Sequence, residues 1–364
     1  QGCAQRRPAR PRRLHVSRLD DVYELVAISS LSHHESALAD HVESVLRTNG
    51  SLDVERIGDN VVARTTGDRS SRVIVAGHLD TVPGDASAAT LSGDVLTGLG
   101  ACDMKGSLAV MLAVALDDAP RSDEVTWVFY AREEISRSES GLSELIEKRP
   151  ELLKGDVAVL CEPTGGVVEA GCQGTLRVRV DVTGQRAHTA RPLSGRNAIH
   201  RAAEIITRVA HYEPRRVELD GVEYSDQLQV VFVEGGVAAN VVPDAATITI
   251  NHRVAPDRTG DEATAWLRDY LGDLLEDVDT FSVVDWAPSA PPSLGNEKLG
   301  SLVALSHGPV RGKLGWTDVA TFHELSIPAT NFGAGDPLLA HRSDEKITRR
   351  EVEDFERVLR EWLR

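Results

Sequence analysis

The chain has 364 residues, of which 41% are hydrophobic, a length and composition that favour a globular protein of two domains. Its 56 acidic side chains outnumber 40 Lys and Arg, and the resulting net charge of −16 repels polyanions. No apolar run reaches the roughly 18 residues that span a bilayer. We therefore expect a soluble protein with no nucleic-acid partner and no membrane association.

Two further features of the composition bear on location. Residues 1–16 concentrate Arg and Pro without a following apolar segment, so they are predicted to be a disordered extension and not a complete export signal. The cysteines lack C-x-x-C spacing, which disfavours a disulfide framework and a thiolate zinc site: Cys3, Cys102, Cys161 and Cys172. A reducing cytoplasm is the expected compartment.

The first half of the chain alternates apolar runs with a helix-like segment. Residues 72–77, 125–131 and 156–161 are short apolar runs typical of buried strands, and residues 105–116 are predicted to form a helix. This alternation predicts an α/β fold, in which a larger domain has a mostly parallel central sheet flanked by helices.

The middle of the chain has a different pattern. Residues 175–184 alternate apolar and polar side chains with period two, and further strands are predicted at 228–236 and 246–254. Helices are predicted at 197–212 and 261–278. They would cover one face of an antiparallel sheet whose other face is solvated.

The pattern of the first half returns at residues 326–335, after a proline cluster at 287–293. No internal repeat accompanies the change. We therefore predict a discontinuous larger domain, formed by residues 17–174 and 292–364, with a smaller α+β domain inserted between its halves at 175–291.

Acidic and His-containing segments follow the predicted strands, where open α/β sheets place their ligand sites. His78 and Asp80 share one face if the strand at 72–77 continues, so His78 could bind a metal while Asp80 orients its ring. Single H-x-D sequences are also common in solvated surface turns, which is the alternative interpretation.

Asp103 lies in a glycine-rich turn before the predicted helix. A phosphate-binding loop is the rival interpretation, but that loop needs Gly, then Lys, then Ser or Thr, whereas the order here is Lys105, Gly106, Ser107. Nucleotide binding is therefore disfavoured. The carboxylate of Asp103 can instead offer its two oxygens to two metal ions.

Four more candidates follow strands. Glu133 and Glu134 are adjacent carboxylates whose side chains diverge, so one can bind a metal while the other accepts a proton; a solvated loop is the alternative. Glu162 directly follows an apolar strand, so it must be solvated, paired or metal-bound. His341 follows the last strand and a glycine turn, a position that suits a last metal ligand.

Together these segments supply two histidines and several carboxylates, a set that suits zinc better than magnesium, and a shared aspartate suggests two ions. Local sequence does not decide which of Glu133 and Glu134 is the base. His188 lies in a loop of small residues within the inserted domain, and loop residues often carry function.

Seven segments occur in the order and spacing of a known family: GHLDTVP, GLGACDMKGS, AREE, CEPT, AHTARPLSGRNA, GGVAANVVPD and GDPLLAH. From about Leu19 onward the chain resembles the aminoacylase and carboxypeptidase superfamily of dinuclear zinc hydrolases. The resemblance implies a larger zinc-hydrolase domain, an inserted dimerisation or lid domain, and a homodimer. It also implies two Zn²⁺ per subunit, with Co²⁺ able to substitute, and a small N-acyl amino acid as substrate.

The resemblance assigns roles to the candidate residues. It implies one bridging aspartate and four side chains that complete two zinc sites: Asp103 as the bridge, His78 and Glu162 on one ion, Glu134 and His341 on the other. Asp80 would support His78, Glu133 would be the general base, and a cis peptide bond would follow Asp103. His188 would reach the active site of the partner subunit and stabilise the oxyanion.

The motifs most resemble those of family members that hydrolyse N-succinyl-LL-2,6-diaminopimelate in lysine biosynthesis. Asn240 and Arg253 resemble substrate-contacting residues, and Arg191 and Arg196 are further cationic candidates for the substrate's carboxylates. Thr321 lies near a position where family members often carry an arginine, which bears on the substrate and leaves the metal chemistry untouched.

Two alternatives to that substrate stay open. Acetylornithine deacetylase, or another N-acyl amino-acid hydrolase or peptidase, would use the same metal chemistry. A non-catalytic binding protein on the same fold is an alternative of another class, and the presence of Glu133 argues against it because a degenerate site needs no base.

Overall fold

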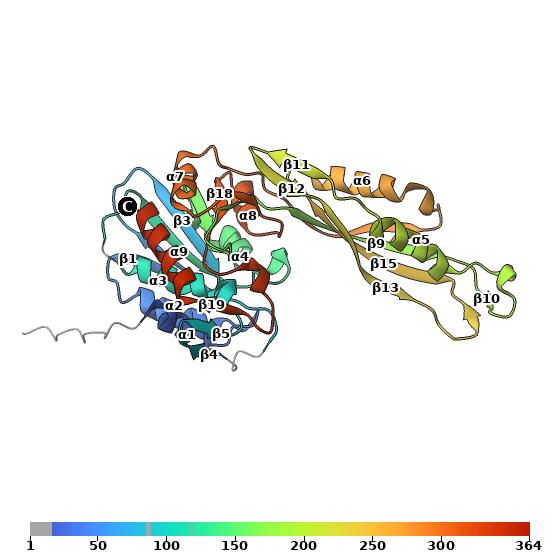
Figure 1. Cartoon of the computed structure of the whole chain (residues 1–364), viewed down its shortest axis with the longest axis horizontal. Coiled ribbons are helices and arrows are strands. Elements are labelled where there is room, and N and C mark those ends of the chain that lie inside the picture. The colour runs from blue at the N-terminus through green and yellow to red at the C-terminus, as the bar shows by residue number, and fades with distance from the viewer. Residues whose placement is uncertain (1–16, 85–88, 118) are drawn as a thin grey trace, which may run out of the picture.

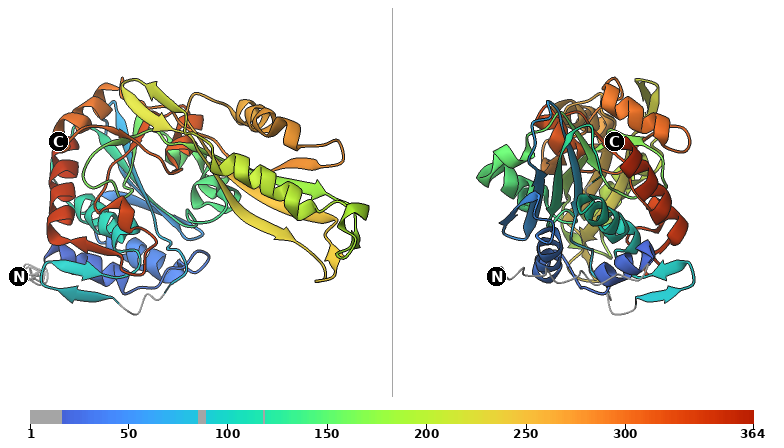
Figure 2. Two further views of the ribbon diagram at one scale, coloured as in Figure 1. Left: turned by 45° about the vertical axis from the view of Figure 1, so that its right-hand side comes forward. Right: turned by 90° about the vertical axis from the view of Figure 1, so that its left-hand side faces the viewer.

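The computed structural model describes residues 17–84, 89–117 and 119–364, so the predicted extension at 1–16 lies outside the described residues. The chain forms a rounded lobe and an elongated lobe that projects from it (Figures 1 and 2). The rounded lobe contains an eight-stranded sheet, and the elongated lobe contains a four-stranded sheet.

The sheet of the rounded lobe confirms the predicted, mostly parallel arrangement. Its strands run in the order β1 (Leu52–Ile57), β2 (Asn60–Thr65), β6 (Glu124–Tyr130), β3 (Arg72–His78), β7 (Val157–Leu160), β18 (Ala329–Asn331), β8 (Glu169–Ala170) and β17 (Arg311–Gly312). The central strands β6, β3, β7 and β18 are parallel. Because β18 pairs with β7, the C-terminal part of the chain completes the sheet that the first half begins.

Helices cover both faces of this sheet (Figure 2). One hydrophobic core includes residues of α1 (Arg18–Val26), α2 (Ser36–Leu46), α3 (Gly106–Ala115), α7 (Glu297–Leu305) and α9 (Arg349–Trp362). The opposite core includes residues of α4 (Gly141–Lys148) and α8 (Val319–Glu324). Helix α3 is almost wholly buried, which explains why its sequence is apolar on every side. A small sheet of β4 (Thr90–Ser92), β5 (Val95–Thr97) and β19 (Lys346–Thr348) completes the lobe.

The elongated lobe has the predicted antiparallel sheet with one covered face. Its strands run in the order β13 (Gln227–Gly235), β15 (Ala245–Val254), β9 (Gly174–Thr183) and β16 (Thr280–Ala287), and its helices are α5 (Ala198–Ala210) and α6 (Gly260–Leu271). On β9, Leu176 and Val178 are buried, whereas Arg177 and Arg179 are exposed. Helix α6 ends before the predicted residue 278 because Gly272 takes a positive φ and leads into a 3₁₀ turn.

Strand β16 was missed by the sequence analysis. Its register against β9 shifts between Val283 and Asp285, so one extra residue interrupts the pairing. Such a bulge breaks the period-two alternation by which a half-buried strand is recognised. The domain boundaries at residues 175 and 291 stay a prediction. In chain order, β9 is the first strand of the elongated lobe's sheet and β16 is the last.

Two short strand pairs complete the elongated lobe. The pair β10 (Ala187–His188) and β14 (Val241–Val242) lies at its distal end, and the hairpin of β11 (Arg216–Leu219) and β12 (Val222–Ser225) lies near the rounded lobe (Figure 1). Among the described residues, no helix has both the length and the apolar character required to cross a membrane.

Candidate active site

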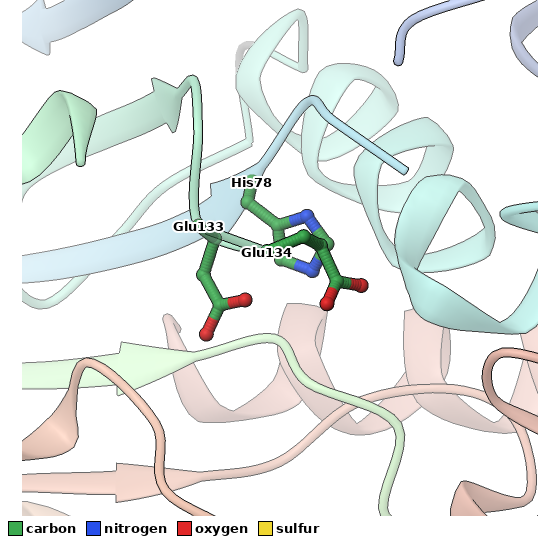
Figure 3. A group of neighbouring side chains, drawn as sticks. All are labelled: His78, Glu133 and Glu134. Atoms are coloured by element: carbon green, nitrogen blue, oxygen red, sulfur yellow. The ribbon is translucent and has the colours of Figure 1, made fainter. Parts of the chain in front are cut away.

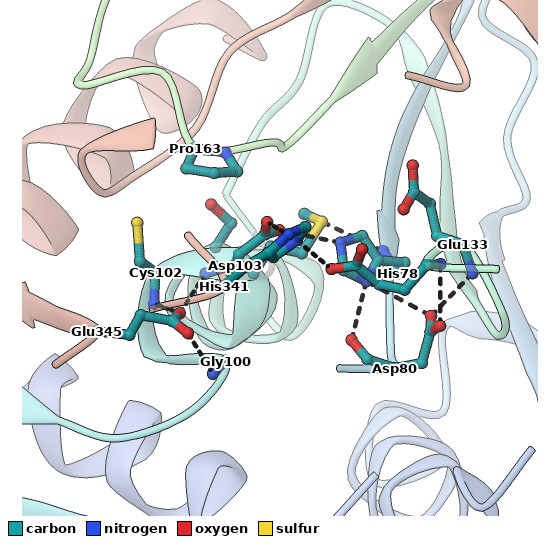
Figure 4. Close-up of polar contacts among 12 residues, drawn as sticks. His78, Asp80, Gly100, Cys102, Asp103, Glu133, Pro163, His341 and Glu345 are labelled. Carbon is teal, nitrogen blue, oxygen red and sulfur yellow. Dashed lines mark hydrogen bonds and ion pairs between the residues drawn. The ribbon is translucent and has the colours of Figure 1, made fainter. Parts of the chain in front are cut away.

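The predicted metal-binding residues meet at one edge of the eight-stranded sheet. His78 is the last residue of β3, Glu133 and Glu134 follow β6, and Glu162 follows β7. Because these three strands are parallel neighbours, their carboxyl ends bring the following residues together. Asp103 from the turn before α3 and His341 from the loop after β18 reach the same place (Figure 4).

Asp103 lies between two groups of potential ligands. Its Oδ1 is 3.1 Å from Nε2 of His78, and its Oδ2 is 3.4 Å from Nε2 of His341. The same His341 nitrogen is 2.8 Å from Oε1 of Glu134. Ligand atoms within 4.8 Å of one another form two sets that share this aspartate: His78, Asp103 and Glu162, and Asp103, Glu134 and His341. Each set mixes imidazole and carboxylate donors, which suits zinc.

Asp103 is held in place by a residue that the sequence analysis missed. Glu345 is 2% exposed, and its carboxylate accepts hydrogen bonds from the backbone N–H groups of Gly100 (3.0 Å), Cys102 (2.8 Å) and Asp103 (2.9 Å). The Asp103–Met104 peptide bond is cis, as expected. The only sequence signal for Glu345 was an acidic residue shortly after His341, in a segment that resembles a solvated loop.

Asp80 positions both the histidine and the adjacent glutamates. Its carboxylate accepts hydrogen bonds from the backbone N–H groups of Glu133 (2.9 Å) and Glu134 (3.1 Å) and from the hydroxyl of Ser32 (2.7 Å). Nδ1 of His78 lies 3.0 Å from the backbone oxygen of Asp80 and 3.5 Å from its carboxylate. The backbone carbonyl of Asp80 is therefore closer to the imidazole than the carboxylate that was expected to orient it.

The side chains of Glu133 and Glu134 diverge (Figure 3). Glu134 contacts His341, whereas the carboxyl group of Glu133 points away from the Asp103 contacts (Figure 4). Burial, followed by the neighbouring carboxylate of Glu162, raises the pKa of Glu133 well above its usual range. A carboxylate with a raised pKa beside a metal cluster is suited to accept and return a proton. A third potential ligand set, His78, Glu133 and Glu134, keeps Glu133 within reach of the same cluster.

The electrostatics favour a bound cation at the metal-ligand cluster, which consists of His78, Asp103, Glu134, Glu162 and His341. Burial opposes protonation of His78, but Asp103 and Asp80 outweigh it and raise its pKa well above the usual value. Asp103 and Glu134 raise the pKa of His341 to about 10. Burial raises the pKa of Glu162 to about 7, and within the described part of the chain its Oε1 has no hydrogen-bond partner. Divalent cations would supply the charge and displace the imidazole protons, so the residues fit a metal pair.

The cluster opens into a cleft of about 750 Å³ between the two lobes. Glu133, Glu134 and His341 line it from the rounded lobe, and Arg253 and Arg177 line it from the elongated lobe. Arg253 was predicted to contact substrate, whereas Arg177 was missed because it looks like an ordinary solvated position of an alternating strand. A cleft of this size is typical of a small-molecule site.

Arg253 lacks a carboxylate partner among residues 17–84, 89–117 and 119–364. Its Nη1 donates to Oγ1 of Thr175 at 2.5 Å. Burial and the nearby charge of Arg177 lower its pKa. A half-buried guanidinium without a counter-ion is a natural partner for an anionic ligand, because guanidinium and carboxylate groups form paired hydrogen bonds.

The remaining predicted residues lie at the distal end of the elongated lobe. His188 pairs with Val241 across β10 and β14, and Asn240 accepts a hydrogen bond from the backbone N–H of Thr189 at 3.2 Å. Arg191 is exposed in the adjoining loop, and Arg196 forms an ion pair with Glu276 at 2.5 Å. Strand β10 lies at the tip of the elongated lobe, away from the rounded lobe that carries the metal-ligand cluster (Figure 1). The structure therefore does not bring these four residues to the cleft of this chain.

The fold and the site define a class of metallohydrolase. The aminopeptidase PepT from Bacillus cereus has the same fold, with a TM-score of 0.77 over 95% of this chain and 97% of that one; at 17% identity the likeness shows the fold alone. The sequence profile of Peptidase family M20/M25/M40 matches residues 74–364, so the chain belongs to this family.

Two relatives are more similar to this chain in sequence. A Mycobacterium tuberculosis protein named for succinyl-diaminopimelate desuccinylase, DapE, is 45% identical over 93% of this chain and 96% of its own length. The succinyl-diaminopimelate desuccinylase of Corynebacterium glutamicum is 40% identical over 93% of this chain and 94% of its own length.

Proposed function

We propose that this protein is a zinc-dependent amidohydrolase that converts N-succinyl-LL-2,6-diaminopimelate and water to succinate and LL-2,6-diaminopimelate, a reaction of lysine and diaminopimelate biosynthesis. The observation that carries the proposal is the pair of ligand sets that share Asp103, with Glu133 beside them in a cleft that also contains Arg253. The two relatives named for this activity support the choice of substrate.

The metal-binding roles follow from the contacts. We propose that Asp103 bridges two zinc ions and that the other ligands divide as their distances suggest: His78 and Glu162 on one ion, Glu134 and His341 on the other. Bound zinc would polarise the acyl carbonyl and make the attacking water more acidic. The same nitrogen and oxygen donors would accept Co²⁺ in place of Zn²⁺.

The protein's own proton transfers centre on Glu133. Its carboxylate would take the proton of the attacking water at one oxygen and deliver it to the leaving amine nitrogen as the amide bond breaks. Asp80 would act as a positioning residue, because it holds the backbone of Glu133 and Glu134 and contacts the imidazole of His78. Arg253 would bind a substrate carboxylate in the cleft.

A second subunit would complete the site. Strand β10, which contains His188, lies at the tip of the elongated lobe, away from the rounded lobe that carries the metal-ligand cluster (Figure 1). A role of His188 in stabilising the oxyanion would therefore require that it enter the cleft of a partner. Arg191, Arg196 and Asn240 lie at the same distal end, and substrate contacts that they make would belong to the partner's cleft as well. The edge strand β13 supports a homodimer, because it exposes the apolar side chains of Val231, Phe232 and Val233.

We also propose that the protein works in the cytoplasm. Its three described cysteines are buried and free: Cys102, Cys161 and Cys172. Free thiols are typical of a reducing compartment.

A side-by-side assay tests the substrate. The purified protein with added zinc would be given N-succinyl-LL-2,6-diaminopimelate and N-acetyl-L-ornithine, and the release of free amine would be measured. We expect the succinyl compound to be hydrolysed with much the higher kcat/KM. Equal rates would end the specific claim, and zinc binding without hydrolysis of any N-acyl amino acid would support a non-catalytic binding protein instead.

A further inference from the structure

An ion pair of the elongated lobe faces the cleft and has no role in the chemistry described above. Arg177 on β9 and Asp285 on β16 are joined at 2.9 Å between Nη1 and Oδ2, and both line the cleft. Their side chains are 49% and 45% exposed, so the pair contributes little to stability. Both charged groups are accessible to a ligand.

The bulge in β16 is what places Asp285 on this face. The register against β9 passes from Val283 opposite Val178 directly to Asp285 opposite Arg177. Without the extra residue, Val284 would stand opposite Arg177, and Asp285 would stand opposite Leu176, the next residue of the pairing. Bulges re-aim side chains and occur often beside active sites.

The surrounding charges determine which ligand the pair suits. Arg253 lies on the neighbouring strand β15 and borders the same cleft, so this side offers two guanidinium groups and one carboxylate. The proposed substrate has one end that carries an ammonium and a carboxylate on the same carbon. Such a group can exchange partners with an ion pair: its carboxylate meets the arginine, its ammonium meets the aspartate, and no charge is left unpaired.

We propose that Arg177 and Asp285 bind the free amino-acid end of the leaving amine and select substrates that carry both of its charges. This inference rests on the proposed function and extends it from the hydrolysed amide to the remote end of the substrate. A ligand with only an anionic end would face Asp285, and one with only a cationic end would face Arg177. Specificity would therefore arise from repulsion as well as attraction.

Three substrates distinguish the effect of the remote ammonium from that of the remote carboxylate. N-succinyl-LL-2,6-diaminopimelate has both, N-succinyl-L-2-aminopimelate lacks the remote ammonium, and Nα-succinyl-L-lysine lacks the remote carboxylate. With added zinc, we expect Asp285→Asn to lower kcat/KM for the full substrate relative to the aminopimelate compound by roughly 10- to 100-fold. Arg177→Gln should lower kcat/KM for the full substrate relative to the lysine compound by a similar factor, and Arg177→Lys should restore part of it.

A matched pair on the same strand provides the control. Arg179 and Asp181 form another exposed ion pair on this face of β9, at 2.8 Å, and neither lines the cleft. Arg179→Gln and Asp181→Asn should leave both substrate ratios at the parental values. Circular dichroism and zinc content would verify that all variants are folded and loaded.

The outcomes distinguish this inference from the proposed function. If the parent hydrolyses the succinyl compounds and the Asp285 and Arg177 variants lose activity equally on all three, the pair does not read the remote charges and this inference fails alone. If the parent hydrolyses none of them, the proposed substrate is wrong and this inference falls with it. A fall of the first ratio in Asp285→Asn alone, and of the second ratio in Arg177→Gln alone, would establish the inference.

Discussion

The metal-ligand cluster and the distal end of the elongated lobe are built in opposite ways. Most residues of the cluster lie at or just after the ends of buried parallel strands. Supporting residues such as Asp80 and Glu345 hold its ligands through several hydrogen bonds. His188, by contrast, is exposed on a two-residue strand, and its Nδ1 accepts a local hydrogen bond from the backbone N–H of Ala190 at 3.0 Å. The comparison indicates that a single chain preorganises the proposed metal ligands, whereas the proposed role of the distal residues would need a partner to position them.

Glu133→Gln should have the largest effect, because it removes the proposed proton carrier while keeping the size of the side chain. We expect kcat to fall by roughly 10²- to 10⁴-fold with the zinc content unchanged. Glu147→Gln, on the exposed face of α4, is the matched control and should have parental activity. A Glu133→Gln protein as active as the parent would refute the mechanism.

His188→Ala tests the other side of the comparison. Loss of one oxyanion donor should lower kcat by roughly 10²- to 10³-fold. If the residue acts across a dimer, mixing this variant with Glu133→Gln should restore activity, because one site of each hybrid then has both functional residues.

The mixing experiment needs a measure of exchange. Differently tagged subunits, isolated through both tags, would show that hybrids have formed. Hybrids without recovered activity would rule out the proposed action across the dimer, and a monomeric parent that remains fully active would do the same.

Glu345→Gln should weaken the cluster without touching a proposed ligand directly. The amide has one acceptor oxygen in place of two, so part of the support for the Asp103 turn is lost. We expect zinc affinity to fall roughly 10- to 100-fold and the free energy of unfolding of the metal-free protein to fall by about 1–3 kcal/mol. Zinc titration and denaturant unfolding measure the two quantities.

The neighbouring residue provides the control for that variant. Asp344 is 60% exposed and pairs with Arg342, so Asp344→Asn should change neither zinc affinity nor stability appreciably. Equal effects of the two substitutions would show that Glu345 does not position Asp103.

Arg196→Gln should have the smallest effect. Its ion pair with Glu276 is exposed, so its loss should lower the free energy of unfolding by less than about 1 kcal/mol. Because Glu276 already engages the guanidinium, we expect KM to stay at the parental value. A rise in KM of about tenfold would instead place Arg196 in the cleft of the partner.

Much of the fold could be predicted because burial leaves a local signature. The buried strands β3, β6 and β7 read as continuous apolar runs in the sequence, since both faces of the parallel sheet are covered. The period-two pattern of β9 identified a half-exposed strand, because only one face of that sheet is covered. The bulged strand β16 was missed because its extra residue disrupts that pattern.

The residues of the candidate site also fall into two groups: those that local sequence indicates and those that only the tertiary structure reveals. The sequence by itself determined which side chains follow strands or lie in the glycine-rich turn before α3, and therefore which of them could share one edge of the sheet: His78, Asp103, Glu134, Glu162 and His341. Only the tertiary structure revealed that Glu345 supports Asp103 from 242 residues away, that the Asp80 backbone carbonyl is the closest partner of Nδ1 of His78, and that Arg177 faces the cleft. Local patterns record how each segment is buried, whereas contacts between distant segments depend on how the segments pack.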